Sequence, residues 1–126
     1  MNSKEMKIMI IDDSILARKQ LKDVLTSMGF QHFTEAINGE EAISIYRDFQ
    51  PDIAFLDIKK KKKDGIAVVR ELREYDKNAY IVMVSSVGTQ RQVKAAIEAG
   101  AVEFVPKPCN EAQIQAIMQA RMEGHN

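Results

Sequence analysis

Residues 8–13 read Ile-Met-Ile-Ile-Asp-Asp, an apolar run that ends in two carboxylates. A continuous apolar run of this kind is typical of a strand buried on both faces of a parallel sheet. Similar runs occur at 53–56 and 80–84, and less continuous ones at 33–36 and 102–105. The sequence therefore predicts five strands, three of them nearly continuous in apolar residues.

Amphipathic segments lie between and after these runs. In the first, apolar residues recur at helical spacing up to a glycine that favours a helix end: Ala17, Leu21, Val24, Leu25, Met28 and then Gly29. The four later segments each open on a residue that can cap a helix: Asn38, Asp64, Thr89 and Asn110. We therefore expect five helices, one after each strand.

Strict alternation of five strands with five helices predicts one doubly wound α/β domain over residues 1–126. It is a (βα)5 fold, with a parallel five-stranded sheet and helices on both of its faces. Ligands bind to such sheets outside the carboxyl ends of the strands, where the strand order reverses. The residues that directly follow each apolar run are therefore the candidates for function.

The overall composition is that of a globular protein, with 45% apolar and 29% charged residues. Basic and acidic residues are equal in number, but five of the lysines form the single run 59–63, so the rest of the chain is acidic. We expect no direct binding to nucleic acid. No apolar stretch is long enough for a signal peptide or a membrane span, and the lone Cys109 fits a reducing compartment. A cytoplasmic protein without membrane insertion is expected.

Carboxylates, hydroxyls and one amine follow the predicted strands: Asp12 and Asp13, Asp57, Ser85 and Ser86, and Lys107. Carboxylates about 5 Å apart repel by roughly 3 kcal/mol per pair at an effective dielectric near 20, so a fold that gathers them needs a counter-charge. A hard divalent cation such as Mg²⁺ prefers oxygen ligands of this type. With the metal and the amine in place, one carboxylate can act as a nucleophile toward phosphorus.

Five motifs occur in order along the chain: Ile11-Asp12-Asp13-Ser14, Leu56-Asp57, Asp64-Gly65, Val84-Ser85-Ser86 and Phe104-Val105-Pro106-Lys107-Pro108. Through them the chain resembles, over nearly its whole length, the bacterial response-regulator receiver domain. The resemblance implies the flavodoxin/CheY-like fold and a CheY-like switch in two-component signalling. Taken singly, each motif has a simpler explanation; Asp12, Asp13 and Ser14, for example, also suit a helix N-terminus.

The resemblance also implies a metal site and a phosphoacceptor. Asp57 would accept a phosphoryl group from a histidine kinase. Asp13 and Asp57 would bind Mg²⁺ directly, together with the backbone carbonyl of Lys59, and Asp12 would act mainly through water.

Three further positions take roles from the resemblance. Ser85 would donate a hydrogen bond to a phosphoryl oxygen, and Lys107 would pair with another. Phe104 matches the aromatic residue whose burial reports the state of the site. The bond between Lys107 and Pro108 would be cis.

The segments 84–88 and 95–107 most resemble chemotaxis-type members of the family. We therefore expect a stand-alone, monomeric switch rather than an enzyme, with a protein target on the face formed by the fourth helix, fifth strand and fifth helix. Two alternatives share the same switch: a receiver domain taken from a transcription factor, and a sporulation-type phosphorelay intermediate. An aspartate-nucleophile phosphatase would need a second carboxylate two residues after Asp57, where Lys59 stands.

The largest departure from the family is the lysine run 59–63. The family usually has Met-Pro at the positions of Lys60 and Lys61, so this loop lacks a proline that would fix its backbone. Five neighbouring ammonium groups also repel one another. We expect a looser loop and weaker metal binding, and a signalling-impaired binding module stays open as an alternative.

Overall fold

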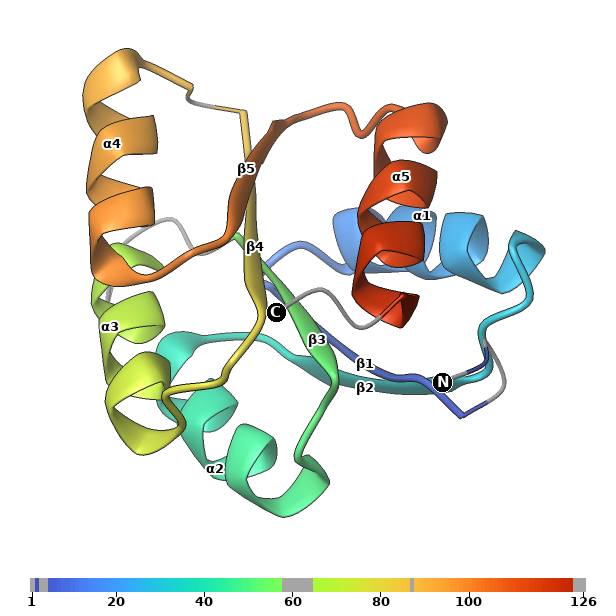
Figure 1. Ribbon diagram of the computed structural model, residues 1–126, viewed down its shortest axis with the longest axis horizontal. Coiled ribbons are helices and arrows are strands. Elements are labelled where there is room, and N and C mark those ends of the chain that lie inside the picture. The colour runs from blue at the N-terminus through green and yellow to red at the C-terminus, as the bar shows by residue number, and fades with distance from the viewer. Residues whose placement is uncertain (1, 3–4, 58–64, 87, 124–126) are drawn as a thin grey trace.

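The computed structural model describes residues 2, 5–57, 65–86 and 88–123. Along these residues strands and helices alternate from end to end (Figure 1). The elements are β1 Lys7–Asp12, α1 Ile15–Ser27, β2 His32–Ala36, α2 Gly39–Phe49, β3 Ile53–Asp57, α3 Gly65–Tyr75, β4 Ile81–Ser85, α4 Gln90–Ala99, β5 Glu103–Pro106 and α5 Glu111–Met122. The predicted order of elements is confirmed, with each strand within one residue of its apolar run.

The strands form a single parallel sheet in the order β2-β1-β3-β4-β5. The chain moves outward from β1 to β2, then crosses back over β1 to β3, so the direction of winding reverses between β1 and β3. This flavodoxin-like order places the switch point at the carboxyl ends of those two strands. The predicted doubly wound fold is confirmed.

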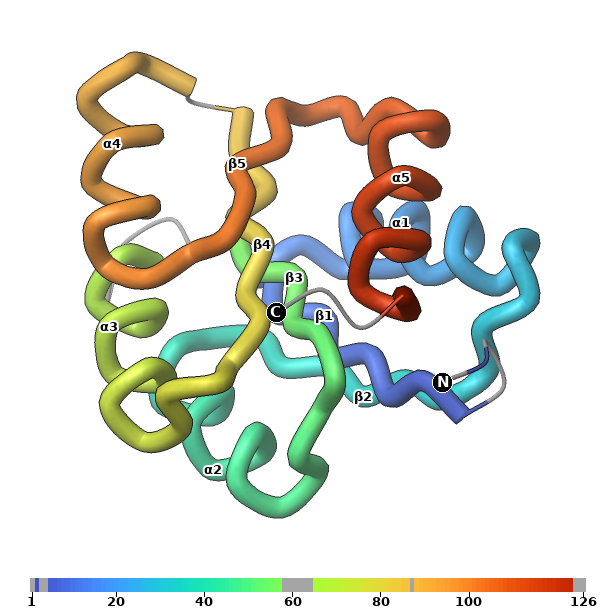
Figure 2. The backbone as a smooth tube through the Cα atoms, viewed as in Figure 1, coloured from blue at the N-terminus to red at the C-terminus, as the bar shows by residue number. Residues whose placement is uncertain are grey.

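Helices cover both faces of the sheet, with α1 and α5 on one side and α2, α3 and α4 on the other (Figure 2). Alternate side chains of β1 serve the two cores, because successive residues of a strand point to opposite faces. Met9 and Ile11 belong to the core under α2, α3 and α4, whereas Ile8 and Ile10 belong to the core under α1 and α5. This two-sided burial explains why the four residues of β1 between Lys7 and Asp12 are all apolar.

Capping side chains start three of the helices as the sequence predicted. The side-chain oxygen of Asn38 accepts a hydrogen bond from the Glu41 amide at 2.8 Å, and Thr89 and Asn110 cap α4 and α5 in the same way. Such caps satisfy amides that the first helical turn leaves without a partner. The expected cap Asp64 lies outside the described residues.

The described part of the chain contains no helix that is long and apolar enough to cross a membrane. The peptide bond between Lys107 and Pro108 is cis, as the resemblance implied.

Candidate functional site

Asp12 and Asp57 lie side by side at the switch point of the sheet. They are the last residues of β1 and β3, and they are partners in the register of these two strands. Asp12 is 5% exposed and Asp57 is 3% exposed. Two carboxylates buried this deeply need a positive partner to offset their lost hydration.

Lys107 supplies that positive charge. Its Nζ lies 2.9 Å from Oδ2 of Asp12 and 2.5 Å from Oδ2 of Asp57. Burial by itself lowers the pKa of Lys107, but the hydrogen bonds and charges of Asp57 and Asp12 outweigh it and raise the pKa above its usual value. The three side chains therefore form a buried cluster of two carboxylates and one ammonium, with a net negative charge.

The backbone of Lys107 is fixed by the neighbouring strand. Its amide donates to the carbonyl oxygen of Ser85 at 3.0 Å, one residue beyond the paired positions Ser85 and Pro106. The carboxyl end of β4 thus holds the lysine above the carboxyl ends of β1 and β3. The ends of β1, β3 and β4 and the segment that follows β5 are far apart in the sequence. They meet at this edge because all strands of the sheet run parallel.

Asp12 is anchored at its carboxylate and at its main chain. Its Oδ1 accepts a hydrogen bond from the Ser14 amide at 2.9 Å. Its carbonyl oxygen accepts another from Nη1 of Arg18, at 2.7 Å. Ser14 also caps α1 by accepting from the Ala17 amide at 3.1 Å, so the helix start and the carboxylate cluster share one turn of chain.

The metal ligands expected from the sequence are only partly brought together. Asp12 and Asp57 are adjacent, whereas the side chain of Asp13 is exposed. Within residues 2, 5–57, 65–86 and 88–123, no group of three His, Cys, Asp or Glu side chains is arranged to hold a metal ion. Lys59, whose carbonyl was expected as a ligand, lies outside the described residues.

The donor chemistry of the cluster nevertheless fits Mg²⁺. Two buried carboxylates share a single ammonium, and a third carboxylate, Asp13, follows Asp12 directly. Mg²⁺ takes oxygen ligands, keeps several waters, and is commonly bound through one or two carboxylates. The residues present can therefore hold this ion.

Ser85 and Phe104 lie on the two strands next to the cluster. Ser85 ends β4 and is half-buried. Phe104, on β5, is also half-buried and packs against the core under α2, α3 and α4. A Cβ added to Gly88 would lie 3.6 Å from Cε1 of Phe104, so the ring borders the loop between β4 and α4.

Comparisons with known proteins agree with this arrangement. The sequence matches the family described as the response regulator receiver domain over residues 8–119. It is 37% identical over 108 residues to the chemotaxis protein CheY of Thermotoga maritima, covering 86% of this chain and 90% of that protein. It is 39% identical over 102 residues to CheY of Bacillus subtilis, covering 81% and 85% of the two chains.

The chain belongs to the response-regulator receiver domain family. Among solved structures, it is similar to the crystal structure of the CheX-CheY-BeF3-Mg²⁺ complex from Borrelia burgdorferi. That similarity has a TM-score of 0.85 at 37% identity and covers 91% of this chain and 88% of the other. The family resemblance and the fold predicted from the sequence are thereby confirmed.

A groove of about 540 Å³ opens beside the carboxylate cluster of this receiver domain. One wall is the face of α1 that carries Gln20 and Val24, and the other contains Ser86, Lys107 and Cys109. Burial raises the pKa of the Cys109 thiol, although the charge of Lys107 acts in the opposite direction. A raised pKa keeps the thiol in its protonated form near neutral pH.

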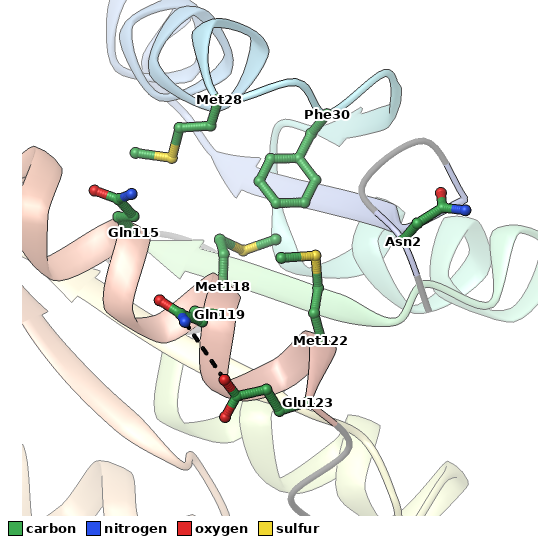
Figure 3. A pocket seen from close by; sticks show the side chains of 8 residues that line it. All are labelled: Asn2, Met28, Phe30, Gln115, Met118, Gln119, Met122 and Glu123. Atoms are coloured by element: carbon green, nitrogen blue, oxygen red, sulfur yellow. Dashed lines mark hydrogen bonds between the residues drawn. The ribbon is translucent and has the colours of Figure 1, made fainter.

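A second hollow lies at the far end of α1. It has a volume of about 560 Å³ and is shown in Figure 3. Three methionines and a phenylalanine surround it, together with four polar residues at its rim: Met28, Phe30, Met118 and Met122, with Asn2, Gln115, Gln119 and Glu123. Among the described residues, its lining offers no paired carboxylates and no lysine or arginine, unlike the cluster at the carboxyl ends of β1 and β3.

Sequence reasoning missed the contacts that surround Asp12. Arg18 and Glu35 were not among the expected site residues, yet Arg18 is 9% exposed and contacts the Asp12 carbonyl. A signal was present in the sequence. Arg18 stands three residues before Leu21 and seven before Leu25, which places a charged residue on the apolar face of a predicted helix.

Proposed function

We propose that this receiver domain accepts a phosphoryl group on Asp57 from the phosphohistidine of a histidine kinase. The observation that supports this most directly is the ammonium of Lys107 shared between the carboxylates of Asp12 and Asp57. A buried aspartate with an adjacent fixed cation suits the formation and retention of an acyl phosphate, because the transferred group carries negative charge on its oxygens.

In the proposed reaction a carboxylate oxygen of Asp57 attacks the phosphorus atom. The bond between phosphorus and the imidazole nitrogen breaks, the imidazole leaves, and an acyl phosphate remains on Asp57. Lys107 neutralises charge on the phosphoryl oxygens, and the Ser85 hydroxyl donates a hydrogen bond to one of them. The domain carries the group as a signal and is not proposed to turn over a substrate as an enzyme.

Mg²⁺ is the proposed cofactor. Asp13, Asp57 and the carbonyl of Lys59 would hold it, with Asp12 contributing through water. When bound, it supplies positive charge beside the phosphoryl oxygens.

The phosphorylated state is proposed to change binding on the face formed by α4, β5 and α5. Two large apolar side chains are exposed there, Ile97 on α4 at 46% and Val102 just before β5 at 42%. Phe104 belongs to β5, a strand of this face, and is half-buried, so a change in its burial would alter the surface. The Borrelia CheY structure is a complex with CheX, which is consistent with a protein partner for this family.

A chemotaxis-type role is proposed because the two CheY relatives are matched over most of their own lengths. We propose a monomer in the cytoplasm with no direct contact to nucleic acid. A receiver domain that works within a transcription factor is distinguished by its partner, because its output would be DNA binding rather than binding of a separate target protein.

The proposal is tested by exposing the chain to acetyl phosphate and Mg²⁺ and measuring its intact mass. We expect the mass to increase by one phosphoryl group, and peptide mapping to locate that group on Asp57. Asp57→Asn should abolish the gain, whereas Asp23→Asn, at an exposed aspartate on α1, should preserve it. No mass gain in the parent chain, or a gain that persists in Asp57→Asn, would contradict the proposal.

Ser85→Ala tests whether Ser85 links phosphorylation to target binding without affecting Mg²⁺ binding. The hydroxyl is not among the proposed Mg²⁺ ligands, so Mg²⁺ affinity measured by calorimetry should stay within about twofold of the parent, the range typical of substitutions outside a contact network. Target binding should respond less to phosphorylation, because one contact that differs between the two states is lost. An unchanged response of target binding would remove Ser85 from the switch.

A further inference from the structure

Arg18 is a buried charged residue that the proposed reaction does not use. It lies on the first turn of α1, and its side chain is enclosed between that helix and the edge strand β2. Its Nη1 donates to the carbonyl oxygen of Asp12 at 2.7 Å, and its Nε donates to Oε1 of Glu35 at 2.8 Å. The guanidinium therefore joins β2 to the end of β1.

The carbonyl of Asp12 belongs to the peptide group that leads into Asp13. That group is planar and rigid, so a partner that fixes the carbonyl oxygen also fixes the direction of the Asp13 amide. At the same time, the Asp12 carboxylate is held by the Ser14 amide and by Lys107. Through this carbonyl, Arg18 fixes the direction of the backbone between Asp12 and Asp13.

The charge of Arg18 is balanced locally by Glu35. One carboxylate oxygen of Glu35 faces Arg18, and the other lies 3.6 Å from Nζ of Lys22. An unbalanced guanidinium this close to Asp12 would oppose the approach of a divalent cation. The pairing with Glu35 lets Arg18 supply rigid hydrogen bonds while adding little positive charge to the site.

We propose that Arg18 is a positioning residue for the Mg²⁺ site, acting through the backbone carbonyl of Asp12. This inference rests on the proposed function, because it concerns the metal site through which Asp57 is phosphorylated. The planar fork of arginine is required, since it donates to two acceptors in fixed directions, and the point charge of a lysine does not reproduce this.

The test measures Mg²⁺ affinity by calorimetry without any phosphodonor. Arg18→Lys and Arg18→Met should raise the dissociation constant about tenfold or more, the range found when outer partners of metal ligands are removed. Glu35→Gln should also weaken binding, because it leaves the guanidinium charge unbalanced. The matched control is Lys22→Gln, which removes the other cation facing Glu35 and should stay within about twofold of the parent.

A second measurement works on the metal-free protein. The Ser14 amide is hydrogen-bonded to Asp12 Oδ1, so its hydrogen exchange, followed by NMR, reports whether the turn after β1 is fixed. Exchange should accelerate in the Arg18 variants and stay unchanged in Lys22→Gln. A residue needed only for overall stability would lower the melting temperature without selectively accelerating this amide.

Parental Mg²⁺ affinity together with parental Ser14 exchange in Arg18→Lys would overturn the inference. Equal weakening by Lys22→Gln would do so as well. If Arg18→Met does not fold, Arg18→Lys and Glu35→Gln decide the question. A parent chain that binds no Mg²⁺ refutes the proposed metal site, whereas the exchange measurement still decides whether Arg18 fixes the turn.

Discussion

Replacing Lys107 with methionine removes the ammonium from the carboxylate cluster while keeping a side chain of similar length. Lys107 Nζ lies 2.9 Å from Asp12 Oδ2 and 2.5 Å from Asp57 Oδ2. In the variant the two buried carboxylates face each other without this cation. We expect a large loss of stability from this single substitution.

The size of the loss follows from the geometry. Both carboxylate oxygens contact the same nitrogen, at 2.9 and 2.5 Å, and therefore lie close together. Carboxylates about 5 Å apart repel by roughly 3 kcal/mol at an effective dielectric near 20. Removing one partner of a buried ion pair typically costs 3–5 kcal/mol. The lysine side chain is 20% exposed, so water screens part of its charge. We therefore expect the free energy of unfolding to fall by about 3 kcal/mol.

Urea unfolding at neutral pH, in buffer with a chelator, measures this difference. For a slope of about 2 kcal/mol per molar urea, the midpoint should fall by about 1.5 M. Added Mg²⁺ should recover part of the loss, because a ligand that binds only the folded state stabilises it. The control is Lys19→Met, which removes an exposed ion pair with Asp23 and should cost less than about 0.5 kcal/mol.

The pH dependence gives an independent check. The pKa of Lys107 is raised in the folded protein, so its ion pairs contribute fully below the usual pKa of lysine and are lost as the pH rises through the folded value. The difference between parent and Lys107→Met should therefore shrink only at strongly alkaline pH. A variant within 0.5 kcal/mol of the parent at neutral pH, about the size of an ordinary surface effect, would refute the role of Lys107 as the counter-charge.

Further predictions concern a helix end and a buried tyrosine. Gly100→Ala should destabilise the protein by about 1–3 kcal/mol in urea unfolding, because Gly100 has a φ of 121° and an added Cβ would lie 2.6 Å from Cγ of Arg73. Gly88→Ala, where the added Cβ would meet only ordinary van der Waals contact, should change stability by less than about 0.5 kcal/mol. Tyr46→Phe should cost about 1.5 kcal/mol, because it removes the 2.9 Å hydrogen bond from the hydroxyl to Asp76. Burial and this hydrogen bond raise the pKa of Tyr46 above its usual value of 10.0, so the parent should lose stability as the pH rises past that value, and Tyr46→Phe should lose less.

The strands β1, β3 and β4 were predictable because each is buried on both faces and therefore reads as an apolar run. The edge strands β2 and β5 are less buried, which is why their runs are less continuous. The sequence placed the first strand at 8–11, whereas β1 extends over Lys7–Asp12. The difference at the carboxyl end has a physical reason, since the ladder of β1 with β3 continues through Asp12 and Asp57 although both are polar. These aspartates are strand residues, and their rigid backbone is part of what positions them.

The meeting of Asp12, Asp57 and Lys107 could also be predicted, because the carboxyl ends of parallel strands share one edge of the sheet. The orientation of Asp13 could not, since regular alternation of side chains ends where the strand ends. The Arg18 contacts depend on the distance between α1 and β2, which no local pattern specifies. A charged residue on an apolar helix face predicts a buried partner, but it does not say which carbonyl or carboxylate that partner is.

The contacts of Lys107 suggest how the proposed phosphorylation would change the protein surface. Its ammonium has three donors, and the structure shows it beside two carboxylates. A phosphoryl group on Asp57 would replace one of these acceptors, so the lysine would change partners while its amide stays bound to the Ser85 carbonyl. Movement would then pass to the end of β4 and to β5, where Phe104 pairs with Met83 in register. Because a ligand or modification shifts a conformational equilibrium only through contacts that differ between the two states, these exchanged contacts of Lys107 would help to drive the proposed switch together with the Ser85 contact.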